Sequence, residues 1–353
     1  METALALARR GLGRVWPNPS VGCVLVNNGH VVGRGWTGDG GRPHAETQAL
    51  ARAGGKAVGA TAYVTLEPCA HEGETPACAR ILAEAGMKRV VFAVSDPDPR
   101  TAGKGAEILE KTSVKVEQGL CEAEARALNE GFFRRVLEGR PMVSLKVATS
   151  RDGKIAEKEG VRTRITGEGA QKYSHRLRAT HDAILVGIGT VLADDPDLTC
   201  RLPGLEGASP VRVVLDTHLR MPKTCTLVKS ADAVPVWVVT QNESVPEHLK
   251  ASHFEIIKIN NINNVNETLQ ALAARGITRL LVEGGSRVNT SFLESGLVDH
   301  LLWFRNDEMT LGEAAVPAFA GKKIASAKGL PGFQKTASRA LDGDFVDFLE
   351  RLD

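Results

Sequence analysis

Three potential metal ligands, His44, Cys69 and Cys78, limit how this chain can fold more than any other feature of its sequence. One imidazole and two thiols suit zinc, and a set of three protein ligands leaves a position open for water, as catalytic zinc sites require. Glu46, close to His44, remains as a carboxylate that could take a proton from that water and pass it to a leaving group. Residues so far apart in the chain can form one site only if the fold brings their segments together.

The apolar patterns of the first half place both metal-ligand segments at turns from strand to helix. Apolar runs predict strands, and apolar stripes with a helical period predict helices. The strands are expected at 21–26, 30–36, 61–66, 89–94 and 114–117, and the helices at 2–11, 44–53, 76–85, 104–111 and 121–137. Such alternation is typical of a layered α/β fold, in which ligand sites gather where the strands end.

The segment Glu138-Gly139-Arg140-Pro141 is the best candidate for a linker between two domains. We therefore expect one domain at 1–138 and a second at 142–353, in line with usual domain sizes. In the second domain a polar loop should extend to residue 166, and helices should occupy 167–180 and the residues after Ser286. Its strands are expected at 142–148, 183–186, 211–215, 236–239, 277–282, 298–304 and 344–349.

Charge and cysteine content argue against several classes of protein. Lys and Arg total 44 against 42 for Asp and Glu, a net charge of +2 that disfavours a nucleic-acid partner. Six cysteines in 353 residues do not make a disulfide framework. No apolar run approaches the roughly 18 residues of a membrane span, and no apolar segment of a signal peptide follows the N-terminus. We therefore expect a cytoplasmic protein with no membrane partner.

The metal-ligand segments resemble those of the zinc deaminases of bases and nucleotides, whose signature is H-x-E followed by P-C-x-x-C. One feature differs, because the second cysteine here lies nine residues after Cys69. That long insert, residues 69–78, resembles the deaminase half of the bifunctional riboflavin-biosynthesis deaminase/reductases. The upstream string Trp16-Pro17-Asn18-Pro19-Ser20-Val21-Gly22 is similar to the same family.

This resemblance implies a cytidine-deaminase-like, three-layer α/β/α domain at the N-terminus. It implies that Zn²⁺ is bound by His44, Cys69 and Cys78 and that Glu46 is catalytic. It also implies substrate contacts at two residues, Asn18 and His71. The alternatives for the cysteines are a structural zinc knot or unrelated buried thiols.

Two glycine turns in the second half each follow an expected strand. They are Gly187-Ile188-Gly189-Thr190 and Gly284-Gly285-Ser286. Glycine allows the backbone to approach a ligand closely, and a helix N-terminus behind such a turn can bind the pyrophosphate of a cofactor. Taken alone, glycine after a strand is more often a simple turn. No G-x-G-x-x-G motif opens this half, which disfavours a Rossmann domain.

Longer strings around these turns resemble the reductase half of the same riboflavin family. They are residues 145–154, 187–196 and 282–285. The resemblance implies a dihydrofolate-reductase-like α/β domain that uses NADPH. The implied cofactor contacts are Ala148, Arg164, Thr190, Asp194, Thr217, Gly285, Ser286, Arg287, Val288, Asn289, Thr290 and Ser291. The implied substrate contacts in this half are Arg162, Arg178, Leu198, Arg201 and Glu283.

Four positions depart from the family pattern. Arg151 stands where the family usually has leucine, and Arg162 and Arg164 stand where it usually has serine and tryptophan. Glu74, in the zinc insert, occupies a position that is often basic in the family. The contact to a substrate phosphate is therefore missing there or is supplied by another group.

The resemblance implies two consecutive reactions of riboflavin synthesis on a phosphorylated pyrimidine. The first removes the C2 amine of 2,5-diamino-6-ribosylamino-4(3H)-pyrimidinone 5′-phosphate by hydrolysis. The second uses NADPH to reduce the ribosyl group of 5-amino-6-(5-phosphoribosylamino)uracil to ribityl. We expect a homo-oligomer. The alternatives are a cytidine or tRNA adenosine deaminase, a non-catalytic metal-stabilised binding protein, and a deaminase of this pathway with a decayed reductase domain.

Overall fold

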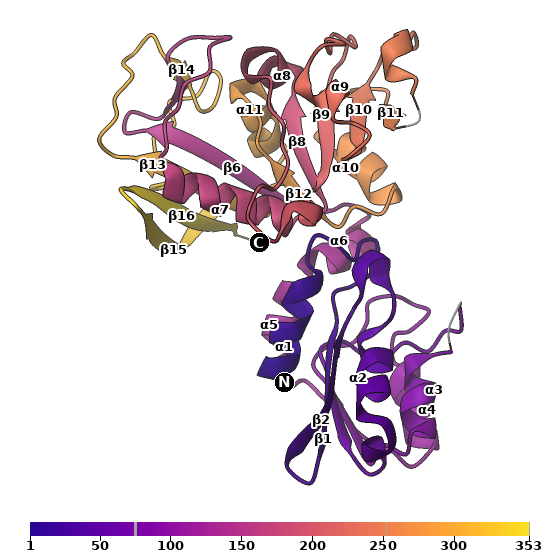
Figure 1. Ribbon diagram of the computed structural model, residues 1–353. Helices are drawn as coiled ribbons and strands as arrows, with labels where there is room; N and C mark the ends of the chain where they lie inside the picture. Colours follow the sequence, from indigo (N-terminus) through magenta and orange to yellow (C-terminus); the bar gives the residue numbers. More distant parts are fainter. Residues whose placement is uncertain (74–75, 252, 353) are drawn as a thin grey trace. The chain divides into compact units, whose positions relative to one another are not determined.

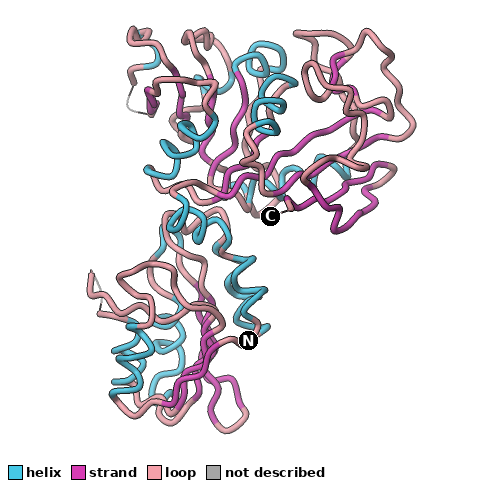
Figure 2. Tube along the Cα trace, turned by 180° about the vertical axis from the view of Figure 1, so that it is seen from behind, coloured by secondary structure: helices cyan, strands magenta, loops and turns pink. Residues whose placement is uncertain are grey.

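The computed structural model describes residues 1–73, 76–251 and 253–352. The chain divides into two compact units, Met1–Gly139 and Arg140–Asp353. The strands of each unit are gathered within that unit (Figure 2). Glu74, the insert residue that departs from the family pattern, lies outside the described residues.

A five-stranded sheet with the order β2-β1-β3-β4-β5 forms the centre of the first unit. β1 pairs with β2 in the expected hairpin and also pairs antiparallel with β3, whereas β3, β4 and β5 run parallel. The strands are β1 (Gly22–Asn27), β2 (His30–Trp36), β3 (Thr61–Val64), β4 (Arg89–Phe92) and β5 (Lys115–Gln118).

Helices cover both faces of this sheet, which confirms the expected three-layer α/β/α arrangement. Figure 1 shows α1 and α5 on one face and α2, α3 and α4 on the other. A Cβ at Gly22 would lie 1.9 Å from the carbonyl oxygen of Ala4 in α1, and one at Gly35 would lie 2.0 Å from that of Ala45 in α2. Only glycine permits such close packing. The helices are α1 (Glu2–Ala8), α2 (Ala45–Ala53), α3 (Cys78–Glu84), α4 (Lys104–Lys111), α5 (Glu122–Leu128) and α6 (Glu130–Glu138).

The single long helix expected at 121–137 is wrong, because the chain bends at Asn129 between α5 and α6. The backbone N–H of Ser20 donates to Asn129 Oδ1 at 2.8 Å, and Asn129 Nδ2 donates to the Ser20 carbonyl at 3.0 Å. Asn129 is buried, with ψ of 18° that ends α5. A helical stripe continues across the bend, so the period alone did not reveal this long-range contact.

The second unit contains a nine-stranded sheet with the order β11-β10-β9-β8-β12-β6-β13-β16-β15. The strands from β11 to β13 run parallel, and β16 and β15 add an antiparallel edge. β6 (Met142–Ser150), β8 (Ala183–Gly187), β9 (Val211–Leu215) and β12 (Arg279–Val282) are four of its central strands. Their carboxyl ends therefore lie together at one edge of the sheet.

The remaining strands are β10 (Val236–Thr240), β11 (Phe254–Lys258), β13 (His300–Asn306), β15 (Phe333–Leu341) and β16 (Asp344–Arg351). A separate ribbon pairs β7 (Lys154–Ala156) with β14 (Val316–Pro317), so the expected polar loop before 166 contains a short strand. The helices are α7 (Glu168–Ala179), α8 (Ile188–Asp194), α9 (Thr226–Lys229), α10 (Val265–Ala274) and α11 (Ser286–Glu294). The α/β class expected for this unit is confirmed. Among the described residues, no helix is both long and apolar enough to span a membrane.

Candidate functional sites

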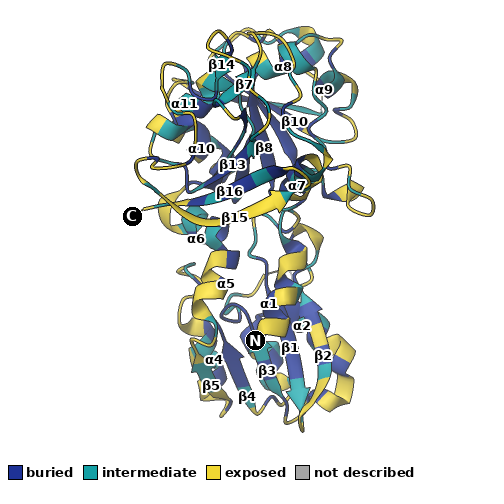
Figure 3. Ribbon diagram, turned by 90° about the vertical axis from the view of Figure 1, so that its left-hand side faces the viewer, coloured by how far each residue is buried: buried dark blue, intermediate teal, exposed yellow. Residues whose placement is uncertain are grey.

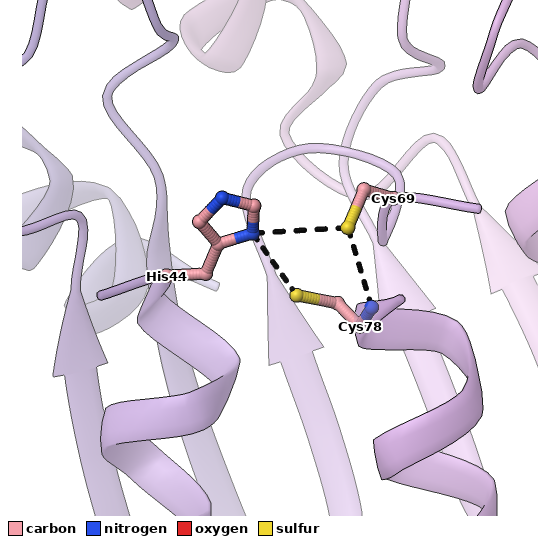
Figure 4. Close-up of side chains that lie close together, drawn as sticks. All are labelled: His44, Cys69 and Cys78. Atoms are coloured by element: carbon pink, nitrogen blue, oxygen red, sulfur yellow. Dashed lines mark hydrogen bonds between the residues drawn. The ribbon is translucent and has the colours of Figure 1, made fainter. Parts of the chain in front are cut away.

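The three expected metal ligands come together at the helix starts of the first unit. His44 is the residue before α2, Cys69 follows β3, and Cys78 is the first residue of α3. His44 Nδ1 lies 3.2 Å from Cys78 Sγ and 3.7 Å from Cys69 Sγ (Figure 4). The backbone N–H of Cys78 donates to Cys69 Sγ at 3.2 Å. We call these three side chains the zinc cluster.

The zinc cluster fits the metal that its residue types suggest. All three ligand atoms lie within 4.8 Å of one another. Bonds of about 2.0–2.3 Å to a tetrahedral zinc ion would place such atoms roughly 3.4–3.8 Å apart, close to the observed separations. A hydrogen bond from Cys78 and the neighbouring His44 outweigh burial and lower the pKa of Cys69 to about 4, so this thiol is a thiolate, the form that binds metal. The three residues would hold Zn²⁺ and leave a fourth position to water.

Glu46 lies in the first turn of α2 and is only 4% exposed. Its carboxylate is not one of the three ligand groups of the zinc cluster. Burial, together with the charge of Cys69, raises the pKa of Glu46 to about 7. The carboxyl is thus placed close to the ligands without being one of them, as a proton-transfer group would be.

Glu67 anchors the turn that carries Cys69, and the sequence pattern did not single it out. This buried carboxylate accepts hydrogen bonds from the backbone N–H groups of Gly103 and Gly105, each at 3.1 Å. It thereby ties the end of β3 to the start of α4. The sequence does contain a signal for this role of Glu67. It is an acidic residue directly before Pro68-Cys69, together with a glycine-rich helix start later in the chain.

The two expected substrate contacts of the first unit lie on the loops beside the zinc cluster. Asn18 Nδ2 donates to the Gly40 carbonyl at 3.4 Å, in the segment that leads to His44. His71 lies in the zinc insert, and its Nδ1 is 3.4 Å from Thr101 Oγ1. Both residues are half-buried.

In the second unit, Glu283 and Arg178 meet at the carboxyl end of β12. Arg178 Nε and Nη2 donate to the Glu283 carboxylate at 3.2 Å and 3.0 Å, and Lys146 Nζ lies 3.8 Å from it. Burial would raise the pKa of Glu283, but the charges of Arg178 and Lys146 and the Arg178 hydrogen bonds lower it to about 2. Lys146 was not expected here. It lies in β6, which pairs with β12, and no pattern in the sequence indicates that pairing.

The other expected substrate contacts of this unit follow α8 or precede α7. Leu198 is buried with a φ of 63°, and Arg201 is exposed and paired with Asp197 at 3.2 Å. Arg178 Nη1 donates to the carbonyl of Thr199, between these two residues, at 3.2 Å. Arg162 is exposed in the loop before α7.

The expected cofactor contacts collect where four neighbouring strands end. Ala148 lies near the end of β6, Thr190 lies in α8 after β8, Thr217 follows β9, and Gly285 follows β12. A Cβ at Gly285 would lie 3.5 Å from Thr190 Oγ1, so these two turns are adjacent. The strand order β9-β8-β12-β6 is the reason, because β12 pairs with β8 although β9, β10 and β11 lie between these two strands in the chain.

The start of α11 offers polar groups that the protein itself does not use. Among the described residues, Ser286 Oγ and Asn289 Oδ1 are buried without a hydrogen-bond partner. Such orphaned groups, with the N–H groups of a helix N-terminus, fit a cofactor phosphate. Gly285 has a φ of −76°, which any residue can adopt, so its role is to leave space.

The other expected cofactor residues differ in their packing, hydrogen bonds and exposure. Val288 packs toward Gly187 and Gly284. The hydroxyls of Thr290 and Ser291 donate back to helix carbonyls at 2.9 Å and 3.1 Å. Of the rest, Asp194 is half-buried at the end of α8, whereas Arg164 and Arg287 are exposed.

Two family models match the chain. The cytidine and deoxycytidylate deaminase zinc-binding region matches residues 1–94, and the RibD C-terminal domain matches residues 141–346. The chain is 41% identical over 340 residues to the riboflavin biosynthesis protein RibD of Bacillus amyloliquefaciens, which covers 95% of this chain and 91% of that protein.

Two solved structures are similar over nearly the whole chain. Acinetobacter baumannii RibD has a TM-score of 0.90 and 36% identity, and the match covers 100% of this chain and 98% of that one. A Thermotoga maritima protein, described as a diaminohydroxyphosphoribosylaminopyrimidine deaminase/5-amino-6-(5-phosphoribosylamino)uracil reductase, has a TM-score of 0.89 and 35% identity. That match covers 100% of this chain and 97% of the other.

Proposed function

The chain belongs to the RibD family of bifunctional riboflavin-biosynthesis deaminase/reductases, and from this membership we propose how its residues divide the two activities. We assign zinc-dependent deamination to residues 1–138 and NADPH-dependent reduction to residues 142–353. The observation that carries the first assignment is the zinc cluster with the buried Glu46 carboxylate beside it but outside it. A structural zinc knot would have no use for that carboxylate.

The substrates follow from the Thermotoga maritima relative. We propose that this chain removes the C2 amine from 2,5-diamino-6-ribosylamino-4(3H)-pyrimidinone 5′-phosphate. It then reduces the ribosyl group of 5-amino-6-(5-phosphoribosylamino)uracil to ribityl. A cytidine or tRNA adenosine deaminase would not need the second unit, which matches the RibD C-terminal domain.

Glu46 performs the proton transfers of the deamination in this proposal. When bound, zinc supplies a water whose pKa is lowered from 15.7 to about 7. The Glu46 carboxylate accepts the proton of the attacking water and delivers a proton to the pyrimidine amine, which leaves as ammonia. Asn18 and His71, on the flanking loops, hold the pyrimidine in place.

The charged cluster at Glu283 binds and orients the substrate of the reduction. NADPH supplies the hydride when it is bound at the start of α11. Arg178 holds the Glu283 carboxylate in one orientation and, with Arg201, suits the substrate phosphate. Lys146 Nζ is a nearby proton donor for the ring oxygen that is released as the ribosyl ring opens.

Separate assays of the two half-reactions on zinc-loaded full chain test this assignment. Ammonia release should depend on zinc and not on NADPH, and NADPH oxidation should require the deaminated substrate. A chain that deaminates but does not bind NADPH would be the decayed reductase. The intact pair of Glu283 and Arg178, with the orphaned Ser286 Oγ, supports the bifunctional enzyme instead.

We further propose that the protein is a cytoplasmic homo-oligomer without a nucleic-acid partner. The described cysteines are all free thiols, as in reducing compartments, and the net charge of +2 offers no basic stripe. β15 is an edge strand exposed along almost its whole length (Figure 3), a surface that pairing with a second copy would cover. Light scattering on the purified protein measures its mass in solution, and the mass of a monomer would contradict the proposed homo-oligomer.

A further inference from the structure

A network of ion pairs in the second unit has the charge to receive the 5′-phosphate of the proposed reductase substrate. Its two carboxylates, Glu283 and Asp197, each contact two cations at nitrogen–oxygen distances of 3.0–3.8 Å. The four cations are Lys146, Arg178, Arg201 and Arg212. We call these six side chains the charge network. Its surplus of two positive charges equals the charge of a phosphate dianion.

The charge network reaches solvent at Arg201. That side chain is 57% exposed, whereas each of the other five is at most 31% exposed. Lys146, in the buried part, is the proposed proton donor for the ring oxygen of the ribosyl group. The 5′-phosphate is attached at the opposite end of that sugar from the C1′ carbon that takes the hydride. The exposed part of the network, at Arg201, is therefore where the phosphate fits.

His175 lies beside this exposed part, and no role has been assigned to it so far. It precedes Arg178 by three residues in α7, so both side chains extend from the same face of that helix. Its Nδ1 lies 3.1 Å from the Thr199 carbonyl oxygen and 3.2 Å from the backbone nitrogen of Arg201. The imidazole is half-buried. His175 thus joins α7 to the loop that carries Arg201.

The contacts of Nδ1 decide which ring nitrogen of His175 carries the proton. Arg178 Nη1 already donates to the Thr199 carbonyl at 3.2 Å. Among the described residues, the Arg201 backbone N–H has no acceptor besides His175 Nδ1. Nδ1 therefore accepts, and the proton of the neutral ring lies on Nε2.

The Nε2–H of His175 is available to a ligand. No group in the described parts of the chain forms a hydrogen bond with Nε2. Burial, followed by the charges of Arg178 and Arg201, lowers the pKa of His175, so the ring is neutral at pH 7 and carries this single donor. Both guanidiniums are close enough to the ring for their charges to act on it.

We propose that His175 binds the 5′-phosphate of the reductase substrate, together with Arg201 of the charge network. The Nε2–H of His175 donates to one phosphate oxygen, and the Arg201 guanidinium donates to another. The hydrogen bond from the Arg201 backbone to Nδ1 holds the ring in place for this contact. The inference rests on the proposed reductase activity. It makes His175 a specificity residue, which distinguishes the phosphorylated substrate from its nucleoside.

Two substitutions test the two ring nitrogens of His175 separately. An asparagine amide lies near the position of Nδ1 and can accept from the Arg201 N–H, whereas a glutamine amide reaches the position of Nε2 and can donate there. The measurement is steady-state NADPH oxidation by zinc-loaded full chain, with the 5′-phosphate and with the dephosphorylated nucleoside as substrates.

His175→Asn should raise KM for the phosphate about 10–100-fold, the effect of losing a hydrogen bond to a charged group, and leave kcat within a few fold. KM for the nucleoside should not change, and His175→Gln should keep most of the preference for the phosphate. NADPH affinity and melting temperature of His175→Asn should stay at wild-type values. His253→Asn is the matched control, because His253 is half-buried and paired with Asp232 at the outer edge of the sheet.

Three outcomes would overturn this role of His175. They are an unchanged preference for the phosphate in His175→Asn, an equal rise of KM for both substrates, and a loss in His175→Gln as large as that in His175→Asn. If wild type oxidises no NADPH with either substrate, the proposed reductase fails instead. Isothermal titration with ribose 5-phosphate then decides: about 10-fold or weaker binding to His175→Asn than to wild type supports the phosphate site, and equal affinity overturns it.

Discussion

The guanidinium of Arg178 holds the carboxylate of Glu283 through two hydrogen bonds, with both side chains nearly buried. Glu283→Gln would leave the charges of Arg178 and Lys146 without their anion. Removing one partner of a buried pair commonly costs about 3–5 kcal/mol, so we expect a lower free energy of unfolding and the loss of reduction. Deamination should continue. Glu294→Gln, which removes an exposed pair with Lys322, should cost at most about 1 kcal/mol in the same chemical denaturation experiment.

Replacement of Glu46 separates metal binding from proton transfer. Because His44, Cys69 and Cys78 remain, Glu46→Ala should keep zinc, and deamination should fall by about 10²–10⁴-fold, the usual contribution of a general acid/base group. NADPH oxidation by the same protein is the internal control. A zinc-free Glu46→Ala protein in metal analysis would show that Glu46 is a ligand.

Local sequence patterns predicted elements well where contacts within one segment decide them. The helix at 104–111 and the strand at 211–215 were predicted with their observed bounds, and the grouping of His44, Cys69 and Cys78 was predicted from residue type and order. The break at Asn129 was missed because it depends on hydrogen bonds to Ser20, far away in the chain. Helix α10 was also missed, although Asn264 accepts a hydrogen bond from the Glu267 N–H and forms a capping pattern that the sequence contains.

The reductase site was harder to assemble because sheet order is not chain order. Lys146 lies in β6 and Glu283 directly follows β12, a sheet neighbour of β6 that is separated from it in the chain by the strands β7 to β11. No period or spacing reveals that neighbourhood. β15 was missed for a different reason, since its side chains are exposed on both faces and give no alternating pattern.

His181 should make the stability of the second unit depend on pH. Burial, followed by the charge of Arg279, lowers the pKa of His181 to about 3 from its usual 6.5. Below pH 6.5 His181 is therefore protonated in the unfolded chain but stays neutral in the folded protein. The contribution to stability is full above pH 6.5 and declines by about 1.4 kcal/mol per pH unit as pH falls toward 3.

His181→Asn removes this titration. Its free energy of unfolding should change less than that of wild type between pH 6.5 and 5, measured by denaturant titration at each pH. The variant also loses the hydrogen bonds of His181 with Leu177 and Ser144. Its free energy of unfolding should therefore be lower by a further amount that does not depend on pH. Parallel curves for both proteins would show that His181 is not the group responsible.

The first unit should fold without the second. α6 ends at Glu138, and Gly139 closes it in the left-handed conformation, so a fragment of residues 1–139 keeps its last helix cap. Arg140 and Asp299 form a buried ion pair, and both belong to the second unit. Ending the fragment at residue 139 therefore removes no partner of a residue that the fragment keeps in this pair. We expect this fragment to be folded by circular dichroism, to contain zinc and to deaminate. An insoluble or metal-free fragment would mean that the second unit completes the first.

Gly284 and Gly285 should differ sharply in what an added methyl group does. At Gly284 a Cβ would lie 2.5–2.6 Å from atoms of Val288, so Gly284→Ala should destabilise the second unit and lower its melting temperature. At Gly285 the only atom of the protein near a Cβ is Thr190 Oγ1 at 3.5 Å, among the described residues, and the φ of −76° suits any residue. Gly285→Ala and Gly285→Val should therefore fold normally.

Any defect of the Gly285 variants must then come from the ligand that uses the open space. We expect NADPH affinity to fall modestly in Gly285→Ala and strongly in Gly285→Val, because the added carbons occupy the approach to the N–H groups at the start of α11. Fluorescence titration of NADPH measures this, with zinc content and deamination as controls that should stay at wild-type values. Equal NADPH affinity in wild type and Gly285→Val would place the cofactor elsewhere. Weak binding with a lowered melting temperature would instead show that the turn has little space to spare.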